Sequence, residues 1–251
     1  MRVTVVGCSG SFPGVDSPAS CYLVQVGDIS VVLDLGSGAL GALQRHLDLR
    51  RLDAVLLSHL HPDHCIDVLA LYIARTYDPR RHYRPMPVYL PTGGAGHLAR
   101  AYGTAEHPGL EGTFEFVEWV DDFPRRIGPL TVTVARVAHP VEAWGMRIEH
   151  DGRTLVFSGD TGPCDALVDL ARGADLALFE SSFEVDRDVS VPADLHMTGR
   201  DAGEAAARAG VRRLVLTHLP PWNDPAVALR EASAVFDGPI ELAVSGATYD
   251  L

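Results

Sequence analysis

The sequence predicts a layered α/β protein, in which helices cover β-sheets, and two observations lead to this prediction. Short apolar runs rich in Val, Leu and Ile recur along the chain between Gly, Pro and Asp residues, which is typical of strands. Segments with helical periodicity lie between several of these runs. Such an alternation favours sheets packed in layers with helices. Since 47% of the 251 residues are hydrophobic, the chain can bury a large core, and we expect one domain over residues 1–251.

The predicted elements follow from these patterns in chain order. Apolar runs predict strands at Val3–Val6, Tyr22–Val26, Ser30–Leu33, Ala54–Leu57, Val88–Leu90, Leu130–Val137, Met146–Glu149, Leu155–Phe157, Leu176–Phe179, Leu214–Leu216 and Ile240–Val244. Helical periodicity predicts helices near residues 39–47, 63–76, 93–102, 164–172, 199–209 and 225–235. Between two of the strands, Asp151-Gly152 predicts a tight hairpin turn.

Charge and cysteine usage restrict the function classes. A formal net charge of −12 argues against a surface that binds a long nucleic acid and favours a small substrate, although bound cations would make a site locally positive. The four cysteines show no CxxC spacing, so we expect reduced thiols. The start of the sequence shows no leader pattern, and no apolar stretch approaches the roughly 18 residues of a membrane span. We therefore expect a cytoplasmic protein that does not associate with a membrane.

The most informative segment is Ser58–His64, which reads Ser-His-Leu-His-Pro-Asp-His and follows the apolar run Ala54–Leu57. An uninterrupted apolar run predicts a strand buried on both faces, with the polar cluster at its carboxyl end, where α/β sheets place ligands. His59 and His61 are two residues apart, so their rings point the same way in an extended loop and can bind one ion. The carboxylate and imidazole that follow them, Asp63 and His64, turn onto the next helix and can reach a second ion. Two hydrolytic metals are therefore expected.

Three later residues are candidate ligands because each follows a predicted strand. His139 comes after the strand that includes Leu130–Val137, Asp160 after Leu155–Phe157, and His218 after Leu214–Leu216. A lone His at a strand end is more often structural or exposed. Three such residues at successive strand ends favour a shared site.

The ordered set His-x-His-x-Asp-His, His, Gly-Asp-Thr, His, which spans positions 59 to 218, resembles the metallo-β-lactamase superfamily. The resemblance implies an αββα sandwich of two mixed β-sheets with helices outside and metals at one edge. It also implies the ligand roles. The first ion would be bound by His59, His61 and His139, the second by Asp63, His64 and His218, and Asp160 would bridge them. The segment around Asp34 matches an early Asp-x-Gly segment that would support a ligand.

Other residues resemble the ribonuclease Z branch of that superfamily. His196, in Leu195-His196-Met197-Thr198 before a predicted helix, matches a His-x-Thr element whose histidine meets the phosphate, and Glu180 matches the acidic residue that accompanies it. A loop histidine near a helix N-terminus is the alternative for His196. The Gly7–Ser11 turn is similar to the glycine-rich opening of these families, so Ser9 is a candidate substrate contact, with a plain turn as the alternative.

The substrate expected from these resemblances is small. Only one predicted hairpin separates His139 from Asp160, where ribonuclease Z carries a long transfer-RNA-binding arm. Over its whole length the chain is similar to an actinobacterial group of cyclic-nucleotide phosphodiesterases, atypical relatives of class II. The sequence departs from the class II signature at Pro62 and Asp67 but keeps the ligands.

Two further features are candidate substrate contacts. The basic stretch Arg75–Arg84, and within it Arg81 and Arg84, could meet a phosphate, with a solvated loop as the alternative. Trp222 follows His218-Leu219-Pro220-Pro221, where a rigid aromatic could stack on a base, with plain packing as the alternative.

The sequence therefore predicts a phosphodiesterase that uses two divalent ions and opens the ring of a 3′,5′-cyclic nucleotide by attack of activated water on phosphorus. Zn²⁺ is the first expectation, and Mn²⁺ and Fe²⁺ suit the same ligands. Asp63 would orient the nucleophile, and His196 with Glu180 would act on the leaving oxygen or the phosphoryl charge. The alternatives are an RNA 3′-end nuclease, a cyclic-phosphate sugar diesterase, a lactonase, a thioesterase, and a non-catalytic metal or nucleotide sensor. A homodimer is a candidate assembly.

Overall fold

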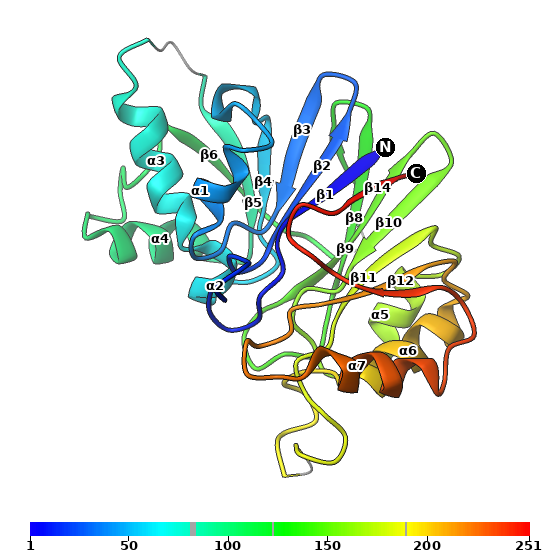
Figure 1. Cartoon of the computed structure of the whole chain (residues 1–251). Coiled ribbons are helices and arrows are strands. Elements are labelled where there is room, and N and C mark those ends of the chain that lie inside the picture. Colours follow the sequence, from blue (N-terminus) through cyan, green and yellow to red (C-terminus); the bar gives the residue numbers. More distant parts are fainter. Residues whose placement is uncertain (81–83, 122, 189) are drawn as a thin grey trace.

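The computed structural model describes residues 1–251 except 81–83, 122 and 189. In this part of the chain, two seven-stranded sheets pack face to face, and helices cover the outer face of each sheet (Figure 1). This is the αββα sandwich that the resemblance implied. The two termini lie side by side, because the last strand pairs with the first.

Both sheets are mixed, and in each one an antiparallel half continues into a parallel half. In spatial order the first sheet consists of β14 (Thr248–Asp250), β1 (Arg2–Gly7), β2 (Cys21–Val26), β3 (Ile29–Leu33), β4 (Ala54–Leu56), β5 (Met86–Leu90) and β6 (Phe114–Glu118). The second consists of β13 (Ile240–Leu242), β12 (Leu214–Thr217), β11 (Leu176–Glu180), β10 (Arg153–Phe157), β9 (Trp144–His150), β8 (Leu130–Arg136) and β7 (Arg125–Ile127). The strands from β3 to β6 and from β10 to β13 are parallel, and the others pair antiparallel.

The helices form the two outer layers (Figure 1). Those on the first sheet are α1 (Ala39–Leu43), α2 (Pro62–Cys65), α3 (Asp67–Tyr77) and α4 (Gly94–Tyr102), with a 3₁₀ turn at Leu49–Arg51. Those on the second sheet are α5 (Asp165–Leu170), α6 (Gly199–Ala209) and α7 (Pro225–Ser233).

The apolar strands are continuous in sequence because both of their faces are buried. In β3, Val31 and Leu33 pack between the sheets, whereas Val32 packs under the helices of the first sheet. In β11, Leu178 packs between the sheets and Phe179 packs under the helices of the second sheet. Successive side chains of a strand point to opposite faces, so each strand serves two cores.

The structure confirms the predicted hairpin and departs from the sequence prediction in two respects. Asp151 and Gly152 have φ values of 50° and 74°, as a type I′ turn between β9 and β10 requires. The predicted helix 63–76 is instead two helices, α2 and α3, which meet at Ile66. The sequence pattern also did not predict three short strands, β6, β7 and β14. Each lies at the edge of its sheet and contains charged residues, so none forms an apolar run.

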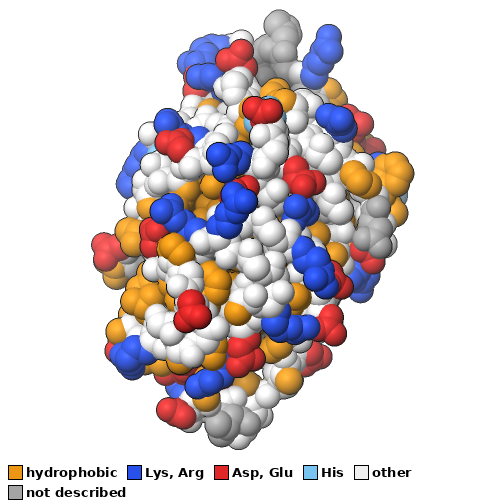
Figure 2. Space-filling model, turned by 90° about the vertical axis from the view of Figure 1, so that its right-hand side faces the viewer, with side chains coloured by type: hydrophobic (Ala, Val, Ile, Leu, Met, Phe, Trp, Pro, Cys, Tyr) orange, Lys and Arg blue, Asp and Glu red, His pale blue; other side chains and the backbone are white. Residues whose placement is uncertain are grey.

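The surface charges, the cysteines and the helices can be compared with what the composition predicted. On the face in Figure 2, basic and acidic side chains are interspersed. All four cysteines, Cys8, Cys21, Cys65 and Cys164, are free, as predicted. Within the described residues, none of the helices combines the length and the apolar composition that crossing a membrane requires.

Candidate metal centre

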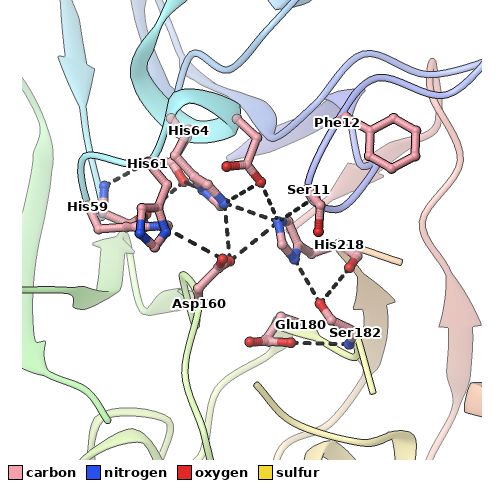
Figure 3. Close-up of polar contacts among 12 residues, drawn as sticks. Ser11, Phe12, His59, His61, His64, Asp160, Glu180, Ser182 and His218 are labelled. Atoms are coloured by element: carbon pink, nitrogen blue, oxygen red, sulfur yellow. Dashed lines mark hydrogen bonds and ion pairs between the residues drawn. The ribbon is translucent and has the colours of Figure 1, made fainter. Parts of the chain in front are cut away.

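The predicted ligands gather at one edge of the sandwich, because parallel strands end at the same edge of a sheet. His59, His61, Asp63 and His64 follow β4 in the first sheet. Side chains from the second sheet approach them across the interface between the sheets (Figure 3). These residues follow or end the strands that run in one direction, and they are His139 after β8, Asp160 after β10, Glu180 in β11 and His218 after β12.

The first group of donor atoms comprises His59, His61, His139 and Asp160, whose facing atoms all lie within 4.8 Å of one another. The Nε2 atom of His59 is 3.0 Å from Nδ1 of His61, which is 3.4 Å from Nε2 of His139. Asp160 Oδ2 lies 3.7 Å from Nε2 of His59. These are the residues that the resemblance assigned to the first ion and the bridge.

The second group comprises Asp63, His64, His218 and again Asp160, and its donor atoms also lie within 4.8 Å of one another. The Nε2 atoms of His64 and His218 are 3.0 Å apart. Asp63 Oδ2 is 3.1 Å from Nε2 of His218, and Asp160 Oδ1 is 3.1 Å from Nε2 of His64. Asp160 therefore turns one oxygen to each group, as a bridging carboxylate does (Figure 3).

Hydrogen bonds to the outer side of the rings fix the tautomers of His59 and His64. Asp34, which is fully buried, accepts from Nδ1 of His64 at 2.7 Å, so Nε2 of His64 carries no proton in the neutral ring. The hydroxyl of Ser58 donates to Asp34 Oδ2 and so accepts from Nδ1 of His59 at 3.1 Å. Both Nε2 atoms are left as electron-pair donors toward the centre.

The same logic applies to the histidines of the second sheet. The Ser182 hydroxyl donates to the carbonyl oxygen of His218 at 2.8 Å, so it accepts from Nδ1 of His218 at 2.9 Å. The carbonyl of Leu195 accepts from Nδ1 of His139 at 2.9 Å. His61 differs from the other four because it turns Nδ1 toward the centre.

The donor set fits divalent cations. With Nδ1 protonated in both rings, the Nε2 atoms of His64 and His218 face each other as two acceptors, an arrangement that a cation between them would satisfy. Asp160 Oδ1 is buried and accepts no hydrogen bond within the described residues. Imidazoles and carboxylates held in this way suit zinc, and manganese or iron can use the same donors.

The electrostatics of the site point the same way. Burial lowers the pKa of His59, His61 and His139, which keeps them in the neutral form that binds metals. Burial opposes ionisation of Asp160, but the positive charges of His218 and His64 outweigh it and hold the pKa of Asp160 well below its usual value. Burial lowers the pKa of His64 as well, but the charges of Asp160 and Asp34 outweigh it and hold this pKa well above its ordinary value. The metal-free site therefore combines the neutral rings of His59, His61 and His139 with ionised carboxylates and with a proton on His64 that a bound cation would displace.

We expect Ser182→Ala to weaken binding of the second ion by about 10-fold or more, because His218 would lose the hydrogen bond that fixes its tautomer. Ser181→Ala is the matched control, since the Ser181 hydroxyl is buried and makes no hydrogen bond to the described residues. Calorimetric titration of the metal-free variants with Zn²⁺ measures the difference. Equal affinity in the two variants would contradict the tautomer assignment.

His196 and Glu180 form a pair beside both donor groups. The Nδ1 atom of His196 lies 2.8 Å from Glu180 Oε1, and its ring centroid lies 5.6 Å from that of His139 and 5.8 Å from that of His218. Glu180 is fully buried and also accepts from the backbone N–H of Thr161. Burial lowers the pKa of His196, but the charge and hydrogen bond of Glu180 outweigh burial and raise this pKa to about 9. In the metal-free protein, His196 is therefore an imidazolium at neutral pH.

The segment that carries His196 is fastened at both ends. Glu231 of α7 accepts from the backbone N–H of Val185 at 2.8 Å and from that of Gly199 at 3.0 Å. The Thr198 side chain caps the N-terminus of α6 in a capping box with Asp201. These bonds hold the backbone on either side of His196.

A pocket of about 280 Å³ opens beside His196. It is lined by His196 and the predicted contact Trp222, together with residues that the sequence pattern did not indicate as contacts: Ser11, Ser182, Phe183 and Arg187. The roles of the two serines depend on tertiary contacts, so the sequence carried no signal for them beyond their proximity to Gly10 and Glu180.

The structure does not support Ser9 as a substrate contact. The residue is buried, and its hydroxyl donates its one proton to the carbonyl of Phe12 at 2.7 Å, so it has no proton left for a phosphate oxygen. Ser11 lines the pocket instead, and its backbone N–H lies 3.5 Å from Nε2 of His218 (Figure 3). The turn needs Gly10, since a Cβ there would lie 2.3 Å from the carbonyl oxygen of His218.

The basic stretch does not reach the site in the described residues. Arg84 is exposed and precedes β5, so it lies at the opposite end of the parallel strands from the ligands. This placement corrects its prediction as a substrate contact. Arg81 lies outside the described residues.

Three residues at the site have left-handed backbones, Ser11, Asp34 and His218, with φ values of 64°, 58° and 56°. This conformation costs a non-glycine residue about 1 kcal/mol or more. The Ser182 hydroxyl on the His218 carbonyl and the Ser58 bonds to Asp34 hold two of them in place. Strain of this kind is concentrated where side chains must point at one centre.

Known proteins resemble this chain over its full length. An uncharacterized protein of Mycobacterium leprae is 47% identical, with 100% of this chain and 89% of that protein covered. The probable metallo-hydrolase YhfI of Bacillus subtilis is 32% identical over 100% of both chains, and its crystal structure superposes with a TM-score of 0.88 over 99% of both.

A ribonuclease Z of Myxococcus xanthus is 28% identical and covers 100% of this chain and 98% of its own. That alignment extends over 302 positions, so the ribonuclease contains segments without a counterpart among the 251 residues here. The family described as the beta-lactamase superfamily domain matches residues 31–219, which include every predicted metal ligand. With this match, the αββα fold and these relatives, the chain belongs to the beta-lactamase superfamily, and its relatives include metallo-hydrolases and ribonuclease Z.

Proposed function

We propose that this protein is a metal-dependent phosphodiesterase that uses two divalent ions to hydrolyse a small phosphodiester, a 3′,5′-cyclic nucleotide. The observation that carries the proposal is the His196–Glu180 pair beside both donor groups. A cationic imidazole at this place suits a phosphate, because it can donate to a phosphoryl oxygen or protonate an alkoxide. The substrates of a lactonase or a thioesterase contain no phosphate that a cationic His196 would bind.

In this proposal each residue of the site has a role in metal binding or in catalysis. His59, His61 and His139 would hold one ion, Asp63, His64 and His218 the other, and Asp160 would lie between them. When bound, the ions lower the pKa of water toward about 7 and neutralise charge on the phosphoryl oxygens. Asp63 orients the attacking water, and His196 gives its proton to the departing 3′ oxygen. Zinc is the expected metal, and cytoplasmic location remains part of the proposal.

Two observations support a small substrate. The pocket beside His196 measures about 280 Å³, and one tight hairpin links β9 to β10 between His139 and Asp160. The ribonuclease Z relative favours an RNA 3′ end as the second candidate substrate, which uses the same attack on phosphorus. Its additional segments and the net charge of −12 here favour the smaller substrate.

We expect Glu180→Gln to lower the pKa of His196 from about 9 to near or below its ordinary value of 6.5, because burial would then oppose the charged ring with less compensation. NMR titration of the metal-free protein measures this pKa directly. Glu204→Gln, at an exposed position of α6, is the control and leaves it unchanged. An unaltered pKa in Glu180→Gln would exclude Glu180 as the group that charges His196.

A substrate panel tests the function. The protein is loaded with Zn²⁺, Mn²⁺ or Fe²⁺ and assayed on 3′,5′-cyclic AMP, 2′,3′-cyclic AMP, a precursor transfer RNA and a lactone. We expect 3′,5′-cyclic AMP to have the highest kcat/KM. Turnover of the RNA alone would support the second candidate, and turnover of the lactone alone would overturn the phosphodiesterase proposal.

A further inference from the structure

We propose that Phe12 and Trp222 form a subsite that stacks the base of a nucleotide substrate, an inference that rests on the proposed function and specifies its substrate class. We call these two residues the aromatic pair. Their ring centroids are 5.1 Å apart and their planes are inclined by 38°. Phe12 is 41% exposed and Trp222 is 62% exposed, although both are large apolar side chains. Single exposed aromatics are common, so the proposal depends on their pairing, their rigidity and their position.

The loop that carries Phe12 is tied to the metal centre. Ser9 Oγ donates to the carbonyl of Phe12 at 2.7 Å, and the backbone N–H of Gly10 donates to the carbonyl of Leu219 at 3.0 Å. Leu219 directly follows His218. The Phe12 ring is therefore held on a backbone whose position depends on a predicted metal ligand.

The loop that carries Trp222 is tied to the same region. The side-chain amide of Asn223 donates to the carbonyl of Ser182 at 2.9 Å, and Arg187 donates to the side-chain oxygen of Asn223 at 2.8 Å. Pro220 and Pro221 restrict the backbone before the indole. The backbones that carry the two rings are thus held in place, so less loop entropy is lost when the rings bind a flat ligand.

The position of the aromatic pair matches the shape of a nucleotide. Trp222, His196 and Ser11 line the same pocket. Phe12 follows Ser11 in the chain, on the loop beside His218 (Figure 3). A phosphate bound at the ions and His196 would leave the sugar in the pocket and the base at its mouth. Every nucleobase has an apolar face, so stacking there favours nucleotides over other phosphodiesters without selecting one base.

The test compares two substrates that differ only by the base, 3′,5′-cyclic AMP and methyl β-D-ribofuranoside 3′,5′-cyclic phosphate. Trp222→Ala and Phe12→Ala should each lower kcat/KM for cyclic AMP by about 10-fold or more, mainly through KM, and leave the base-free substrate within about twofold. Trp222→Phe should retain most of the cyclic AMP activity. Tyr77→Ala is the matched control. Tyr77 is about as exposed as Trp222 and ends α3, away from the metal centre, so the change should leave kcat/KM for both substrates unaltered. Equal losses on both substrates, or none, would overturn the proposal.

A second readout does not depend on turnover. Trp119 and Trp144 are 4% exposed, so the emission that nucleotides can quench comes from Trp222. Titration of the metal-loaded protein with 5′-AMP should quench this emission, ribose 5-phosphate should not, and Trp222→Phe should abolish the response. Quenching equal to that by ribose 5-phosphate would contradict base stacking. Failure of the proposed function itself would appear separately, as wild-type protein that hydrolyses neither cyclic substrate.

Discussion

Asp160→Ala is expected to lower kcat/KM for the phosphodiester substrate by roughly 1,000-fold or more, since several kcal/mol of stabilisation depend on both ions. Asp160 is the one residue of the described chain that belongs to both main donor groups and turns a different oxygen to each. Its loss would remove a ligand from both ions at once, together with the negative charge that offsets the repulsion between the two cations.

Metal analysis by mass spectrometry accompanies the activity assay. The variant should retain fewer than two equivalents after dialysis, whereas wild-type protein should retain both. Asp165→Ala is the matched control, because this carboxylate is exposed on α5 and pairs only with Arg208 among the ion pairs described. An Asp160→Ala protein with two bound ions and wild-type turnover would contradict the bridging role.

His196→Ala is expected to lower kcat by about 100- to 10,000-fold for cyclic AMP while both ions stay bound. The reason is that the 3′ alkoxide is a poor leaving group and needs a proton, which His196 is placed to supply through its pairing with Glu180. With bis(p-nitrophenyl) phosphate the leaving phenolate needs no proton, so the loss should be several times smaller.

The comparison of the two leaving groups separates proton donation from a structural role. His46→Ala, at an exposed position, serves as the control for a histidine deletion. If His196→Ala reduced both reactions equally, we would assign His196 to phosphate binding rather than to proton donation. If the His196→Ala protein lost the bound ions, we would assign His196 to metal binding.

Much of the site could be predicted from the sequence because its side chains follow strands. Parallel strands end at the same edge of a sheet, which predicts that Asp160 and His218 lie close together after β10 and β12. His139 reaches the same edge because β8 and β10 each pair antiparallel with β9 and so run in one direction. Glu180 and His196 were paired by resemblance, and the structure places them 2.8 Å apart. Asp34 likewise supports His64, as the resemblance implied.

Two features of the site could not be predicted from local sequence patterns. One depends on the direction of the strands, and the other depends on tertiary contacts. Between β4 and β5 the chain returns along α3 to the start of the next parallel strand, which carries Arg84 away from the ligands. A crossover between parallel strands always returns the chain in this way, so the direction of the strands alone separates Arg84 from the ligands. The roles of Ser182 and Ser11 depend on contacts with His218, 36 and 207 residues away, and no local pattern encodes them.

The most direct test of the central claim is hydrolysis of 3′,5′-cyclic AMP in ¹⁸O-labelled water by the metal-loaded protein, with the products identified by mass spectrometry. Attack of water on phosphorus with departure of the 3′ oxygen predicts 5′-AMP that carries one ¹⁸O atom on its phosphate. Formation of 3′-AMP, label outside the phosphate, or no turnover with both ions bound would contradict the account.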